Sequence, residues 1–360
     1  MRRLAAATAA LTLLSACSNE PIQRAQPHPE ATPTAASPAD TVAPPRSTPD
    51  QPEELGAVTW RRDFEAARAS SRASGKPMFV LFTEVPGCST VKGFADEVLR
   101  HPLVVEAIED HFTPVAVYNN TSGDADHAIL RSFGERAWNN PVVRIISPDR
   151  DVLAPRFSGP YDVPTLTAAM TRALATAERP TPGYLELLDL EGSAATRGAE
   201  KATFAMGCFW SGEAELGGLD GVVSSRTGFA QGREVVELEY DPRVTSERAL
   251  SSQYGRDTLS GDTTLTTSPK DDKYRLRHTP WRFVPMTSTQ ASRVNAALGA
   301  SQDPSAHLSP RQRGLFDVVS AHPDTAWPLA DPAADLTDMW DRTEALAASL
   351  RASGDDPGRK

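Results

Sequence analysis

The chain is organised around residues 204–213, which read Phe-Ala-Met-Gly-Cys-Phe-Trp-Ser-Gly-Glu. The apolar run 202–206 predicts a buried strand, and the glycine that follows permits a tight exit from it. Cys208 then stands where a helix is expected to begin, and the unpaired backbone N–H groups of a helix N-terminus favour a thiolate. Phe209 and Trp210 add an aromatic wall that suits a thioether or its sulfoxide. This order favours a reactive thiol over a buried structural cysteine.

The same residues resemble the signature of peptide methionine sulfoxide reductase A. The resemblance rests on Gly207-Cys208-Phe209-Trp210, with Glu213 three residues later, and continues more loosely to about residue 298. Other matching segments are Leu219-Asp220-Gly221-Val222-Val223, Thr227-Gly228-Phe229-Ala230 and Lys273-Tyr274-Arg275. The resemblance implies an α+β domain, here residues 201–352 with a C-terminal extension. It also implies a peptide-methionine (S)-S-oxide reductase that needs no cofactor.

The family's active site is only partly matched. Cys208 would be the nucleophile, and Tyr274 matches one of the two tyrosines that hold the sulfoxide oxygen beside a glutamate. The segment that carries this glutamate is missing, so Glu213 and Glu234 remain as two alternative acids. The resemblance implies substrate-binding roles for Phe209, Trp210 and Phe229, of which the last replaces the second tyrosine. No cysteine follows Cys208, so the family's resolving cysteines are absent.

Residues 54–178 form the other predicted domain. Their strands and helices alternate, which predicts an α/β domain with parallel strand pairing. An apolar strand leads into Val85-Pro86-Gly87-Cys88, and a later strand opens at Asn140-Pro141. This order resembles thioredoxin-like domains, in which the cysteine begins a helix and the proline is cis.

The resemblance therefore implies a cis-proline at Pro141 and a working nucleophile at Cys88. Val91 replaces the second cysteine of the usual Cys-x-x-Cys motif, so this domain cannot form its own disulfide. A degenerate domain kept for docking is the alternative.

The N-terminus predicts export. Residues 1–16 combine two arginines, an apolar core and small residues, as in a secretory signal peptide. With Cys17 they resemble the bacterial lipoprotein box, which implies lipidation of Cys17 and anchoring to the cell-envelope membrane, on its periplasmic or extracytoplasmic face. Ordinary cleavage that leaves Cys17 free is the alternative. Residues 17–53 are rich in Pro, Ala and Thr and predict a disordered tether.

The remaining features exclude some classes of function. The net charge of −10 argues against a nucleic-acid partner. The seven histidines are scattered without paired ligand spacing, so no metal site is predicted. Residues 179–200 contain several prolines and glycines and predict an interdomain connector, and residues 281–286 are expected to form a strand.

Two functions remain open. In the first, an envelope lipoprotein reduces methionine sulfoxide in proteins or peptides through Cys208, with Cys88 as the resolving thiol and an external thioredoxin-like thiol protein as the reductant. In the second, a catalytically degenerate lipoprotein senses oxidation or binds oxidised methionine. The intact motif around Cys208 and one cysteine per domain favour the first function. Phe229 and the missing glutamate segment favour the second. We expect the first function, that of an enzyme.

Overall fold

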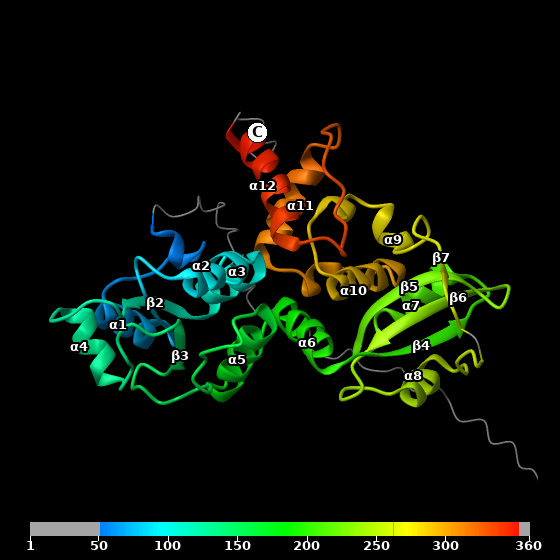
Figure 1. The fold of residues 1–360 in the computed structure, drawn as a ribbon. Coiled ribbons are helices and arrows are strands. Elements are labelled where there is room, and N and C mark those ends of the chain that lie inside the picture. Colours follow the sequence, from blue (N-terminus) through cyan, green and yellow to red (C-terminus); the bar gives the residue numbers. More distant parts are fainter. Residues whose placement is uncertain (1–50, 262, 353–360) are drawn as a thin grey trace, which may run out of the picture. The chain divides into compact units, whose positions relative to one another are not determined.

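The computed structural model describes residues 51–261 and 263–352 and contains two separate sheets (Figure 1). The first sheet has the order β2-β1-β3, and the second has the order β4-β6-β5-β7. Each sheet has its own hydrophobic core. The prediction of an α/β domain followed by an α+β domain is confirmed. The predicted signal peptide, Cys17 and nearly all of the tether lie outside the described residues.

The first sheet is built around its central strand. Its strands are β1 (Met78–Thr83), β2 (Thr113–Tyr118) and β3 (Val142–Ile146). All six residues of β1 are buried, because alternate side chains enter two cores on opposite faces of the sheet. The helices of this region are α1 (Phe64–Ser74), α2 (Ser89–Glu97), α3 (Pro102–His111), α4 (Ala125–Ser132) and α5 (Val163–Thr176), preceded by the 3-10 turn η1 (Glu53–Leu55).

Two predictions for this region are wrong. β1 pairs with β2 in parallel, as expected, but β3 runs antiparallel to β1. Alternation of strands and helices did not reveal this reversal, because strand direction depends on where the intervening chain returns to the sheet. The bond before Pro141 is not cis; the cis peptide bonds of the described chain are Val85–Pro86 and Gly159–Pro160. X-Pro bonds are trans in most folded proteins, and nothing local to Asn140 selects the rarer isomer.

The predicted connector at residues 179–200 contains a 15-residue helix, α6 (Gly183–Arg197). Tyr184, Leu185 and Leu188 are buried on one face of α6 and join the core that also contains residues of α5. Their spacing is that of an amphipathic helix, and this packing outweighs the flanking prolines and glycines.

The second sheet is antiparallel throughout. Its strands are β4 (Glu200–Ala205), β5 (Val222–Ala230), β6 (Arg233–Tyr240) and the short β7 (Thr266–Thr267). β5 and β6 form a hairpin. Its two turn residues, Gln231 and Gly232, both have positive φ, as a type I′ turn requires. The helices that follow the strands are α7 (Phe209–Leu216), α8 (Glu247–Tyr254), α9 (Tyr274–Arg277) and α10 (Ser288–Gly299).

The C-terminal extension is helical, with α11 (Pro310–Ala321) and α12 (Leu336–Ala352). The expected strand at residues 281–286 is wrong, because Pro280–Phe283 forms the 3-10 turn η2. The Trp281 ring in this turn stacks on Phe316 of α11, with 3.5 Å between ring centroids. A further 3-10 turn, η3 (Pro304–His307), precedes α11. Within the described ranges, no helix is long and apolar enough to cross a bilayer.

A buried carboxyl joins α3 to α11. Glu106 is fully buried, and its Oε1 accepts a 2.7 Å hydrogen bond from the backbone N–H of Arg311. Its Oε2 has no hydrogen-bond partner among the described residues. Burial raises the pKa of Glu106 from 4.5 to about 7. The folded protein therefore favours the neutral carboxyl.

We predict that the free energy of unfolding falls as the pH rises from about 5 to 8, because ionised Glu106 is disfavoured in the folded state. The loss is roughly 3 kcal/mol at most, from about 1.4 kcal/mol per pKa unit. Denaturant unfolding of parent and Glu106→Gln at both pH values measures it, with the exposed Glu97→Gln as control. Glu106→Gln should show the smaller pH dependence; equal dependence in all three proteins would contradict the assignment.

Candidate active site

Cys208 lies at the junction between β4 and α7, as the sequence predicts. It is the N-cap residue of α7, with an extended backbone, and its thiol is free and exposed. The Ser211 hydroxyl, one helical turn later, donates to its Sγ over 3.9 Å. A thiol in this position is open to a substrate and lies at the positive end of the helix dipole.

Glu234 of β6 holds this junction in place. The backbone N–H of Met206 donates to the Glu234 carbonyl oxygen at 2.8 Å. The backbone N–H of Phe209 donates to the Glu234 Oε2 at 2.9 Å. One residue of β6 therefore contacts the chain on both sides of Cys208. Its carboxylate is bound at the first turn of α7, by the residue that follows Cys208.

The aromatic residues predicted to bind substrate form one cluster. The ring of Phe209 lies 5.6 Å from that of Phe229 and 6.0 Å from that of Trp210. Trp210 stacks on Tyr274 with 4.2 Å between ring centroids and 20° between ring planes. Phe229 is 44% exposed, so part of the cluster faces solvent. The Tyr274 hydroxyl makes no hydrogen bond to any residue in the described ranges and is free to bind a ligand.

The two candidate acids occupy different environments. Glu213 is completely buried and forms an ion pair with Lys273, with 3.0 Å between Oε1 and Nζ. Burial raises the pKa of Glu213 to about 7, and the Lys273 ammonium opposes this rise. Glu234 is only half-buried. Of the two carboxylates, only that of Glu234 is therefore partly open to solvent.

Sequence reasoning missed Asp271. Its Oδ1 accepts a 3.2 Å hydrogen bond from the indole Nε1 of Trp210, and its Oδ2 accepts one from the Ser268 hydroxyl at 2.5 Å. The Trp210 ring is thereby fixed at its polar edge as well as by stacking. Asp271 lies in a polar stretch without periodicity, which gave no signal that it would contact the tryptophan.

Cys88 lies at the equivalent point of the first sheet. It is exposed, free, and the N-cap residue of α2, which follows β1. Val91 is fully buried, so the place of a second cysteine is part of the core. The Gly87 N–H donates to Glu54 at 2.9 Å, which fixes the turn before Cys88.

Tyr161 is a second residue that the sequence did not indicate. Its hydroxyl donates to the Pro141 carbonyl oxygen at 2.9 Å, and its ring packs on Phe94 of α2. Burial raises the pKa of the Tyr161 phenol, and a charge on the nearby Cys88 adds to this rise. Tyr161 thus links Pro141 to the surroundings of Cys88, although the bond before this proline is not cis.

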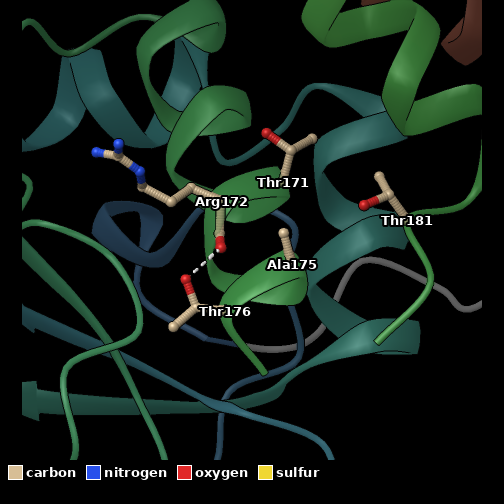
Figure 2. Close-up of a pocket in the computed structure, with 5 residues that line it drawn as sticks. All are labelled: Thr171, Arg172, Ala175, Thr176 and Thr181. Carbon is tan, nitrogen blue, oxygen red and sulfur yellow. Dashed lines mark hydrogen bonds between the residues drawn. The ribbon is translucent and has the colours of Figure 1, made fainter. Parts of the chain in front are cut away.

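Two surface hollows lie away from these residues. One is a shallow hollow beside α5 with a volume of about 620 Å³. Figure 2 shows the side chains that line it: Thr171, Arg172, Ala175, Thr176 and Thr181. The Arg172 guanidinium extends away from Thr181, and short side chains line the remainder. Another hollow, of about 420 Å³, includes Trp60 and Phe112. Neither contains a cysteine or a predicted site residue. The part of the chain that the structure describes also contains no group of three His, Cys, Asp or Glu side chains that could hold a metal ion.

Comparisons with known proteins show similarity to two kinds of protein. A family model described as thioredoxin-like matches residues 59–148, about a quarter of the chain. The chain is also similar to peptide methionine sulfoxide reductases. It is 38% identical over 68 residues to MsrA 1 of a Nostoc species, covering 14% of this chain and 42% of that protein.

Two further methionine sulfoxide reductases are similar to this chain over a segment of comparable length. The chain is 36% identical over 76 residues to the peptide methionine sulfoxide reductase of Drosophila melanogaster, covering 18% of this chain and 31% of that protein. It is 37% identical over 67 residues to reductase A5 of Arabidopsis thaliana, covering 15% and 26%. The chain thus spans less than half the length of these relatives. It combines a thioredoxin-like domain with a segment similar to methionine sulfoxide reductase A.

We predict that Glu234→Gln increases the rate at which iodoacetamide alkylates Cys208 at pH 7. The amide oxygen still accepts from the Phe209 N–H, while the negative charge that opposes a neighbouring thiolate is removed. A gain of roughly threefold to tenfold is expected for the removal of one nearby, partly solvent-screened charge. Glu237→Gln, on the same strand, is the control and should leave the rate unchanged. An equal rate in both variants would show that the Glu234 carboxylate does not act on the thiol.

Proposed function

We propose that this protein is an envelope-anchored thiol oxidoreductase that reduces methionine sulfoxide in proteins or peptides. One observation carries the proposal: an exposed thiol at a helix N-terminus lies beside a partly exposed cluster of four aromatic rings. The cluster suits the methyl group and sulfur of oxidised methionine. The partial similarity to methionine sulfoxide reductases supports the same substrate class.

The proposed reaction begins at Cys208. Its thiolate attacks the sulfoxide sulfur, the S–O bond breaks, and the oxygen is transferred to the cysteine as sulfenic acid while methionine is released. A proton must reach the oxygen during this step. In this proposal the Tyr274 hydroxyl donates a hydrogen bond to the oxygen, and the Glu234 carboxylate relays a proton from water to it.

Cys88 is the proposed resolving thiol. It attacks the Cys208 sulfenic acid, a disulfide forms between the two cysteines, and water leaves. An external dithiol protein then reduces this disulfide by exchange. The bond requires the two Cα atoms to approach within roughly 4.4–6.8 Å, at least transiently. Among described cysteines, Cys88 is the only internal partner that Cys208 has.

Lipidated Cys17 and its tether complete the proposal. Two acyl chains on Cys17 would hold the protein at the envelope membrane, since one chain alone binds only marginally. The prediction rests on the sequence, because these residues lie outside the described ranges.

Two observations favour a second function, in which the protein binds oxidised methionine or reports oxidation without catalysing its reduction. Phe229 contributes no hydroxyl to the site, and Glu213 is buried away from substrate. A protein with this site could bind oxidised methionine, or report oxidation of Cys208, without turning over. The two functions differ in whether methionine is formed.

We predict a Cys88–Cys208 disulfide after one equivalent of a methionine-S-sulfoxide peptide is added to the reduced chain. Peptide mapping by mass spectrometry detects the cross-link in the parent. In Cys88→Ser, first-turnover methionine should be unchanged, while the Cys208 sulfenic acid persists and is trapped by dimedone. If methionine forms but the cross-link is absent and sulfenic acid lifetimes are equal, the relay is wrong. If no methionine forms in either protein, the binding function is favoured.

A further inference from the structure

Four consecutive residues hold α9 against the thiol-bearing helix α7 and strand β5. Asp271 accepts from the Trp210 indole, and Asp272 Oδ1 accepts from the Thr227 N–H at 3.1 Å. Lys273 binds Glu213, and Tyr274 stacks on Trp210. The segment 271–274 is called the clasp below. Tyr274 is the first residue of α9, so the contacts of the three residues before it help to fix where its phenol lies.

The centre of the clasp is a buried charge pair. Glu213 has 0% of its side chain exposed and Lys273 has 10%. Glu213 Oε2 accepts from the Lys273 backbone N–H at 2.8 Å, and Oε1 accepts from the Ser225 hydroxyl at 3.2 Å besides the ammonium. The ammonium also donates to the Ser225 carbonyl oxygen. Glu213 therefore binds both the main chain and the side chain of Lys273.

The backbone of Lys273 shows why this pair matters. Its φ is +52°, in the left-handed region that non-glycine residues rarely adopt, and it is the N-cap residue of α9. Such a conformation persists when surrounding contacts determine it. Here Glu213 contacts both the N–H and the ammonium of this residue, and Asp272 Oδ1 lies 3.6 Å from the same ammonium. The left-handed turn directs the next residue, Tyr274, onto Trp210.

Stability alone is a weak reason for such a pair. The desolvation of two charges largely offsets their attraction, so buried ion pairs often add little to the free energy of folding. Glu213 lies on the same helix as Trp210, three residues later, and therefore couples the position of Tyr274 to that of the aromatic wall. Its side chain is fully buried, which excludes contact with substrate.

We infer that Glu213 and Lys273 are a positioning pair, which fixes the Tyr274 phenol against Trp210 beside Cys208. The inference rests on the proposed function for its effect on rate, but not for its effect on structure. Glu213 thereby acts through Lys273 and Tyr274, and it is not the acid that meets the sulfoxide. Removing either charge should leave the thiol in place and displace the phenol.

A double-mutant cycle tests the inference through activity. The variants are Lys273→Gln, Tyr274→Phe and the two together, with Lys270→Gln as an exposed control in the same loop. Displacement of a catalytic group by about 1 Å can cost roughly a hundredfold, so Lys273→Gln should slow first-turnover methionine release by about that factor. If Lys273 acts through Tyr274, the double variant should be no slower than Tyr274→Phe. If the rate losses of the two single variants add in the double variant, the positioning role is wrong.

A structural readout separates this inference from the proposed function. The Trp210–Tyr274 stack should contribute to near-ultraviolet circular dichroism, measured as the change caused by Tyr274→Phe. Tyr274→Phe should change the spectrum of the parent and of Lys270→Gln, but should change that of Lys273→Gln very little. This result is expected whether or not sulfoxide is reduced. If the change is equally large in Lys273→Gln, the pair does not position the phenol.

A variant that keeps the shape of the pair covers the case in which Lys273→Gln does not fold. Glu213→Gln retains an oxygen for the Lys273 N–H but removes the negative charge, and the same loss of the Tyr274 contribution is expected. Retention of the full contribution in this variant would likewise overturn the inference.

Discussion

The double contact of Glu234 is the constraint on which the site at Cys208 depends. Its carbonyl oxygen accepts from Met206 at the end of β4, and its carboxylate accepts from Phe209 at the start of α7. The cysteine between these two contacts therefore has a fixed backbone while its thiol stays exposed. A strand-to-helix turn held from a neighbouring strand gives a reactive group the rigidity that catalysis requires.

The aromatic cluster is built outward from this turn. Phe209 is buried in the core of the second sheet, and Trp210, the next residue, lies between that core and Tyr274. The clasp then ties Trp210 and Tyr274 to a buried charge pair. The positions of the thiol, the aromatic wall and the phenol are thus set by three different kinds of contact: backbone hydrogen bonds, ring packing and ion pairing. The thioredoxin-like region presents a second exposed thiol in the same local setting, at a strand-to-helix turn.

Local patterns in the sequence predicted much of this arrangement. The turn from strand to Cys208 to helix was predicted because a glycine and a cysteine follow an apolar run. Three features could not be predicted from local patterns, since each depends on residues distant in sequence. They are the direction of β3, the isomer of the bond before Pro141 and the burial of Glu213. Glu213 illustrates the limit. Its place one helical turn from a thiol suggested an acid for the substrate, whereas its partner Lys273 lies 60 residues away and turns it into the core.

The measurement that tests the central claim most directly is the yield of methionine from a methionine-S-sulfoxide peptide in the absence of any external reductant. The account predicts close to one methionine per reduced parent chain, with the two described thiols consumed together, and no methionine from Cys208→Ser. Absence of methionine from the parent, with both thiols still titratable afterwards, would contradict it and leave a protein that binds oxidised methionine without reducing it.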